Sequence, residues 1–231
     1  MGTTVGDWDE LHRRARERYA DGERRLPEGG DERQRQLTRM GNAAGAAGLC
    51  ALMAGRPDAA EWFARAAERY RESWEGAPPD SWGRPIGAIK SRILGGDWDG
   101  AAHDARWALE AGAAESDSPI GRYAAALAFL VLGRWEEARV HADYARTHET
   151  FPTEVADALA FVAAEDVVGY VEAVEDVLES FETRTEYLED VPVADTVLVL
   201  QALAARRGMA AELESPLLPR RKGSDPRSPA S

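Results

Sequence analysis

The 231-residue sequence predicts an all-α protein, an α-solenoid of about 10 helices stacked as antiparallel hairpins. The main observation is a six-residue pattern, Gly-x-(Trp/Pro)-(Asp/Glu)-x-Ala, which occurs at residues 55–60, 96–101 and 133–138. Its glycines lie 41 and 37 residues apart, and each copy separates two runs of helical periodicity. A period of roughly 35–45 residues is typical of stacked helix pairs. The hydrophobic content of 44% is ordinary for a folded domain.

The residues of each copy suit the start of a helix. Pro57 is favoured in a first turn, and Asp58 beside it interacts favourably with the helix dipole. In the other two copies Trp98 and Trp135 stand at the same place, where a large ring fills the wedge between two helices. We therefore expect both tryptophans to be structural.

The expected helices follow in order along the chain. The first spans residues 7–25, where one stripe is apolar and the rest is charged. Asp31 is the expected N-cap of the second helix, which ends near residue 54 and is paired with a helix over 57–75. Three further pairs are expected, at 82–94 with 98–111, 119–132 with 135–147, and 153–164 with 166–182.

These elements form one helical-repeat domain over residues 1–214. Residues 1–36 are an N-terminal helical cap, and residues 37–182 hold the helix-hairpin repeats. Residues 183–214 hold a last helix without a full partner, so we expect it to cap the end of the stack. Residues 215–231 are rich in Pro, Ser and Arg, and we predict a disordered tail there.

Glycine and alanine crowd the second helix between residues 41 and 48. Glycine costs a helix roughly 1 kcal/mol per residue relative to alanine, so its repeated use requires an explanation. Close packing of neighbouring helices is one explanation. The other is a ligand that lies against bare backbone.

The charge is uneven along the chain. The net charge is −13, and residues 149–214 contain 16 acidic and 3 basic residues, which alone give −13. Only two basic residues are lysines, and this depletion beside an acid excess is typical of a high-salt cytoplasm or a GC-rich genome. Salt adaptation would acidify the whole surface, whereas here one third of the chain carries the excess. The asymmetry favours a basic partner for that third and argues against direct nucleic-acid binding.

No motif in the sequence indicates catalysis, a cofactor or a membrane anchor. There is no nucleophile elbow and no phosphate-binding glycine loop with its lysine. Cys50 is the only cysteine, which excludes an intramolecular disulfide, and its apolar neighbours predict a buried thiol. Because no catalytic motif is present, we expect that the protein is not an enzyme. The N-terminus has no secretory signal pattern, so we expect a cytoplasmic protein.

Two histidines leave a metal site open as an alternative. His103 and His141 lie seven and eight residues past the glycines of consecutive repeats. If these places are equivalent, the two rings approach each other between neighbouring helices, and a metal-dependent hydrolase becomes an option. Polar packing at a repeat seam is the simpler interpretation.

The C-terminal segment resembles a known family. Residues 202–219 read Ala-Leu-Ala-Ala-Arg-Arg-Gly-Met-Ala-Ala-Glu-Leu-Glu-Ser-Pro-Leu-Leu-Pro. They resemble the closing segment of the immunity-protein family numbered 49, while the register of residues 37–182 resembles tetratricopeptide repeats. The first resemblance implies a helical cytoplasmic protein that binds and blocks a cognate toxin, often a nuclease. It brings no catalytic residues with it.

Two functional hypotheses follow. In the first, a non-catalytic immunity-type protein binds a basic toxin through the acidic C-terminal helices, opposite a core stripe that includes Val168 and Val174. In the second, a general tetratricopeptide-like scaffold holds a peptide or protein subunit in its groove, where Arg84, Lys90, Arg92 and Arg122 supply charge. The candidate partner-binding residues of the first hypothesis are Glu172, Glu175, Asp176, Glu179, Glu182, Glu186 and Glu189.

Overall fold

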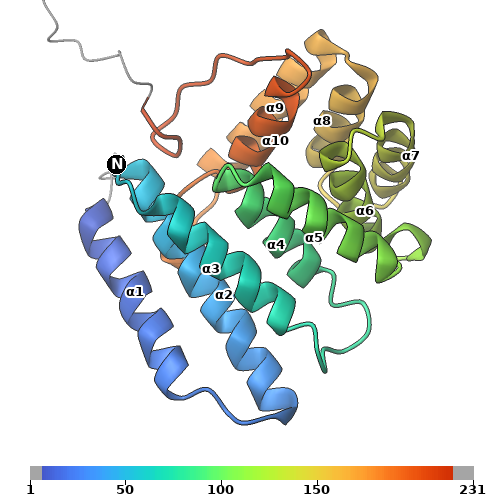
Figure 1. The fold of residues 1–231 in the computed structure, drawn as a ribbon. Helices are drawn as coiled ribbons and strands as arrows, with labels where there is room; N and C mark the ends of the chain where they lie inside the picture. Colours follow the sequence, from blue (N-terminus) through green and yellow to red (C-terminus); the bar gives the residue numbers. More distant parts are fainter. Residues whose placement is uncertain (1–6, 221–231) are drawn as a thin grey trace, which may run out of the picture.

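The computed structural model describes residues 7–220 and confirms the predicted all-α fold of stacked helical hairpins (Figure 1). Two short 3-10 turns, η1 (Ala113–Glu115) and η2 (Leu188–Asp190), interrupt the connections. The α-helices within this range are α1 (Trp8–Arg24), α2 (Gly30–Met53), α3 (Ala59–Glu72), α4 (Gly83–Leu94), α5 (Trp98–Glu110), α6 (Pro119–Val131), α7 (Trp135–Arg146), α8 (Thr153–Ala164), α9 (Val167–Glu182) and α10 (Asp195–Ala205).

The helices form two layers. Each helix from α1 to α9 packs against the next one in the chain, as Figure 1 shows for the row from α1 to α7. In addition α2 contacts α4, α4 contacts α6, and α6 contacts α8, so these four helices form a continuous inner layer. The helices α1, α3, α5, α7 and α9 form the outer layer. This is the arrangement of a helical-repeat stack, in which each hairpin contacts its neighbours.

The repeated glycines end the inner helices as their pattern predicts. Gly55, Gly96 and Gly133 have φ values of +66°, +73° and +72°, the left-handed conformation that stops a helix. At the next junction Glu165 takes the same conformation, with φ +59°, although it carries a side chain. This explains why the fourth junction occurs without a recognisable glycine. At the start of α2 the prediction was wrong, because Gly29 is the N-cap residue and Asp31 lies in the first turn.

The glycines of α2 accommodate aromatic rings of α3. A Cβ atom at Gly41 would lie 3.0 Å from the ring of Tyr70, and one at Gly48 would lie 2.8 Å from the ring of Phe63. Close packing, rather than a ligand against bare backbone, therefore explains these two positions. Gly45, between them, is different, because the nearest atom to a Cβ there is 4.0 Å away.

The C-terminal segment does not cap the end of the stack as predicted. Instead α10 packs on α4 and α8 of the inner layer and on α9, and η2 contacts α2. Val191 and Val193 join the core between the first helices, while Val197 and Leu200 join the core of the later ones. A helix that is apolar on most sides must be surrounded, and α10 meets this requirement by lying across the inner face.

The predicted tail also starts too early. Leu217 and Leu218 are buried in the main core, and the carbonyl of Leu217 accepts a hydrogen bond from the amide of Ala194 at 3.0 Å. The packed structure thus continues past residue 214, because these two leucines cover apolar surface beside α10. Residues 221–231 of the predicted tail, and residues 1–6 of the predicted cap, lie outside the described residues.

Candidate functional site

The acidic candidates of the first hypothesis lie mainly on α9. Asp166 begins this helix by accepting a hydrogen bond from the amide of Gly169 at 3.0 Å. One face packs on the core through Val174, Val177 and Phe181. Val168, expected on that face, is 69% exposed, because the buried stripe passes through Gly169 and Tyr170 instead. Five carboxylates, each exposed, occupy the outer face: Glu172, Glu175, Asp176, Glu179 and Glu182.

The five carboxylates of α9 are not neutralised by ion pairs within the part of the chain that the structure describes. Within residues 7–220, none of the five forms an ion pair, although Glu182 accepts a hydrogen bond from the hydroxyl of Ser215 at 2.7 Å. Neighbours three and four positions apart repel each other, as Glu175 does Glu179. The last turn of α9 contains no basic residue, so Glu179 and Glu182 also face the negative end of the helix dipole. The charge arrangement of α9 therefore opposes the helix that carries it.

The other two acidic candidates lie apart from that face. Glu186 is exposed in the loop after α9, and Glu189 is half-buried in η2. The carboxylate of Glu189 lies 3.0 Å from Nε of Arg18, and its backbone carbonyl accepts a hydrogen bond from the same guanidinium at 3.2 Å. Both residues line a cavity on the inner side. Five of the seven predicted residues thus share one surface, and two belong to another.

The basic residues of the second hypothesis are mostly engaged inside the molecule. Lys90 lies 2.5 Å from the carboxylate of Asp195 in α10. Arg92 lies 3.3 Å from Asp104 and also pairs with Asp97. Arg122 donates to the carbonyl of Ala114 at 2.6 Å. The segment that crosses the inner layer thus engages Lys90, while Arg92 and Arg122 are engaged by residues between α4 and α6.

Arg84, the remaining residue of that set, is different. Its guanidinium donates to the side chain of Gln34, and its Nε atom is buried without a hydrogen-bond partner. No carboxylate within the described residues forms an ion pair with it. Burial without a counter-ion lowers the pKa of Arg84 below its ordinary value. Arg84 lies in the wall of a cavity of about 500 Å³ between α2, α4 and residues 184–196.

The two histidines of the metal hypothesis do not meet. His103 is exposed on α5, whereas His141 is buried and stacks on the ring of Phe129, with Arg122 3.2 Å from its Nδ1. The true equivalent of His141 is Asp104, eight residues past its own glycine, which is 1% exposed. One residue turns a side chain by about 100° around a helix, which separates the two faces. Among residues 7–220, no three His, Cys, Asp or Glu side chains come together as a metal site requires.

Cys50 is buried as predicted, and burial raises the pKa of its thiol to about 12. The side chain is therefore a neutral thiol at physiological pH and behaves as a small apolar residue. No helix in the described part of the chain combines the length and the apolar character of a membrane span.

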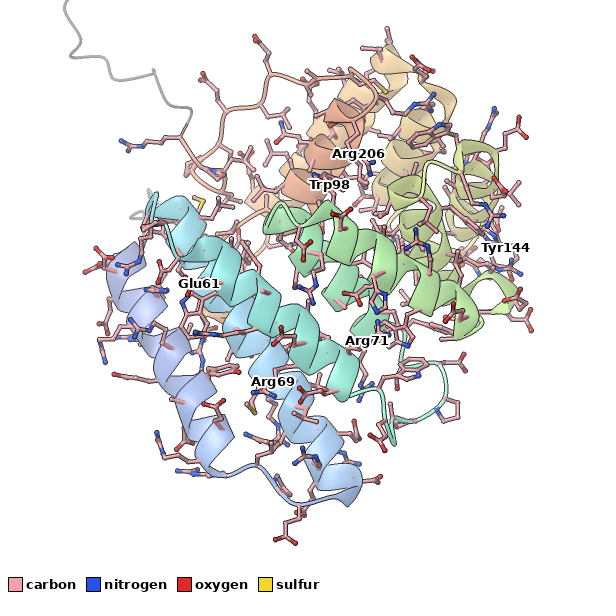
Figure 2. All side chains as sticks on the ribbon, in the orientation of Figure 1. Glu61, Arg69, Arg71, Trp98, Tyr144 and Arg206 are labelled. Atoms are coloured by element: carbon pink, nitrogen blue, oxygen red, sulfur yellow. The ribbon has the colours of Figure 1, made fainter. Side chains whose placement is uncertain are left out.

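The segment that resembles the immunity family has a clear structural task. Arg206 lies 4.4 Å over the ring of Trp98, which Figure 2 labels beside it, and donates to the carbonyl of Val131 at the end of α6. Arg207 repeats this arrangement 4.4 Å over Trp135 and donates to the carbonyl of Val162 near the end of α8. Two adjacent arginines thus fix α10 to successive junctions, and both tryptophans are structural as predicted.

No protein-family model, curated protein or solved structure matches the chain. The likeness of residues 202–219 to the immunity family therefore remains a prediction based on that segment.

Proposed function

We propose that this chain is a non-catalytic protein-binding module that docks a basic protein on the outer face of α9. The partner class we favour is a toxin domain such as a nuclease, whose basic cleft the acidic face would cover. The observation that carries the proposal is the row of five exposed carboxylates on α9 without an ion pair among the described residues. These charges destabilise their own helix, and complementarity to a basic partner would explain their presence.

The inner layer supports this choice over the scaffold hypothesis. Lys90 and Arg92, expected to meet a peptide there, form ion pairs within the chain, and α10 lies across the same layer. A peptide would have to displace packed core residues such as Val197 and Leu200 before reaching it. The outer face of α9 is free of this requirement.

The test compares two sets of four neutralised carboxylates. The first set is Glu172→Gln, Glu175→Gln, Asp176→Asn and Glu179→Gln on α9. The control set is Glu61→Gln, Glu68→Gln, Glu110→Gln and Glu136→Gln, which are exposed on the other outer helices and change the net charge equally. Wild type and both variants serve as bait in native lysate at matched salt, with mass spectrometry to identify what is retained.

The expected result is one basic protein that wild type and the control set retain and the α9 set loses. With that protein purified, the α9 set should weaken its affinity by about 10-fold or more, and co-expression of wild type should relieve its toxicity. If both variants lose the protein to the same extent, overall charge rather than the α9 face determines its retention. Equal affinity of wild type and the α9 set would contradict the proposal outright.

A further inference from the structure

A second surface of the molecule, separate from the outer face of α9, has the features of a small-molecule site. The cavity of about 500 Å³ lies between α2 and α4, beneath the segment that follows α9. Pockets for small organic ligands have volumes of about 300–1,000 Å³ and combine an apolar lining with a few placed polar groups. Leu49, Ile86 and Leu94 contribute apolar surface to this wall. Its charged side chains are Arg84, Lys90, Arg184, Glu186, Glu189 and Asp195.

Arg84 gives the cavity its selectivity. Of the two cationic side chains that α4 places in the wall, Lys90 is neutralised by Asp195, and Arg84 has only the neutral side chain of Gln34. Its buried Nε still lacks an acceptor. A planar guanidinium with free donors pairs best with a carboxylate, which accepts two parallel hydrogen bonds. The missing partner is therefore an anion, and the apolar wall beside it calls for an apolar body.

The cavity is covered by a strained turn, Leu188–Asp190, which contacts Arg18 of α1. Glu189 and Asp190 both have left-handed backbone conformations, with φ values of +56° and +59°. Such conformations are unfavourable for residues with a side chain and persist only where the surroundings enforce them. Arg18 of α1 supplies this restraint through its two contacts with Glu189. Leu188 beside them is 70% exposed, and the buried side chain nearest to the turn is Val191, directly after it.

We propose that this cavity binds a small organic acid, with its carboxylate on Arg84 and its apolar body between α2 and α4. The turn at Leu188–Asp190 covers the ligand, and the ion pair of Arg18 with Glu189 keeps the turn closed. The proposal does not depend on the role of α9. The outer face of α9 is defined by its five carboxylates, and the cavity is defined by Arg84 and its apolar wall.

The experiment titrates the full chain with octanoate and 4-phenylbutanoate, and with their uncharged amides, by isothermal titration calorimetry. The acids should bind about 10- to 100-fold more tightly than the amides, the range expected for a charge-assisted pair. Arg84→Gln should abolish this preference. Arg122→Gln is the matched control, because Arg122 also has a buried Nε without a partner but lies outside the cavity wall. It should bind the acids within about twofold of wild type.

A second variant blocks the cavity without removing the charge. Gly45 lines the cavity, and a Cβ there would lie 4.0 Å from the Cβ of Ala66, an ordinary van der Waals contact, so Gly45→Leu should keep the fold. We expect it to lose binding of every probe while its thermal midpoint stays at or above that of wild type. Gly48→Leu is unsuitable because Phe63 occupies the space.

Three results would overturn the proposal. They are equal affinity for acid and amide, full binding of the acids by Arg84→Gln, and no detectable binding of either acid to wild type at millimolar concentration. Should Arg84→Gln fail to fold, the contrast of acid with amide and the Gly45→Leu variant still decide the matter. None of these results bears on the partner test of α9, which has a different readout.

Discussion

The first and last helices of the outer layer carry the same number of carboxylates and use them in opposite ways. α1 and α9 have 17 and 16 residues, and each contains five acidic side chains. In α1 five arginines accompany them, and pairs such as Arg13 with Glu10 and Arg24 with Asp21 bind along the helix. In α9 there is no basic residue at all. The difference lies in the placement of the arginines, which pair with carboxylates of α1, while those of α9 have no ion pair among the described residues.

The ends of the two helices strengthen this comparison. α1 has Asp9 and Glu10 in its first turn and Arg24 in its last, the arrangement that the helix dipole favours. α9 has no acid in its first turn and two in its last. The charges of α1 therefore stabilise their helix, and those of α9 oppose theirs.

The largest effect is expected where a carboxylate is both paired and buried. Asp104 is 1% exposed and lies 2.8 Å from Arg71 and 3.3 Å from Arg92. Asp104→Asn should lower the free energy of unfolding by about 2–4 kcal/mol, since Arg71 loses its counter-ion and Arg92 keeps only its more exposed pair with Asp97. Urea denaturation measures this. A loss below about 0.5 kcal/mol would mean that pairing contributes little, and the contrast with α9 would fail.

A smaller effect of the opposite sign is expected on α9. Glu175→Gln with Glu179→Gln should raise the free energy of unfolding by about 0.5–1 kcal/mol, because like-charge repulsion and the unfavourable dipole contact are removed. In α1, Glu10→Gln should lower it, because Glu10 binds both Arg13 and Arg14. Added salt should narrow both differences. If the α9 variant proved less stable than wild type, the carboxylates would have a structural role instead.

The smallest expected effect is the pH dependence of stability, which should again differ between α1 and α9. His12 in α1 is 2% exposed, and burial lowers its pKa below the ordinary value. The unfolded chain then takes up a proton near pH 6.5 that the folded chain does not, so stability falls as the pH drops below that value. His141 acts in the same direction, because burial and Arg122 lower its pKa.

The measurement is hydrogen exchange at pH 7.5 and 5.5, corrected for the intrinsic exchange rate. α1 should lose protection on acidification more than α9, which has no histidine. The His12→Phe variant should show a smaller loss in α1. Equal loss at both ends in wild type would assign the pH dependence to global unfolding, and His12 would have no local part in it.

Local rules predicted most of the fold. The glycine pattern located three junctions because a left-handed residue ends a helix wherever it occurs, and the α9 face followed from its periodicity. The fourth junction had no such signal, since Glu165 adopts the same conformation against its preference. For the histidines, the error of one residue between His103 and Asp104 was enough to exchange the exposed and buried faces.

The cavity could not be predicted from the sequence, because its parts come from distant segments. Arg18 and Glu189 are separated by 171 positions in the chain, and Lys90 and Asp195 by 105. Such pairs depend on how α10 crosses the inner layer, and no local pattern encodes that path. The sequence predicted a cap because residues 183–214 contain one helix and no second helix with which it could form a hairpin. Besides α8 and α9, which directly precede it, this helix packs on α4, which lies more than one hairpin earlier in the chain.

The crossing of the inner layer by the last part of the chain changes how the molecule is made. In an open repeat array, each unit depends only on its neighbours, and folding can spread as units emerge. Here Val191 and Val193 complete the core of the first helices, so that core stays unfinished until residues 191–193 have been synthesised. Long-range contacts of this kind slow folding. A chain truncated before residue 191 should therefore leave its first repeats open.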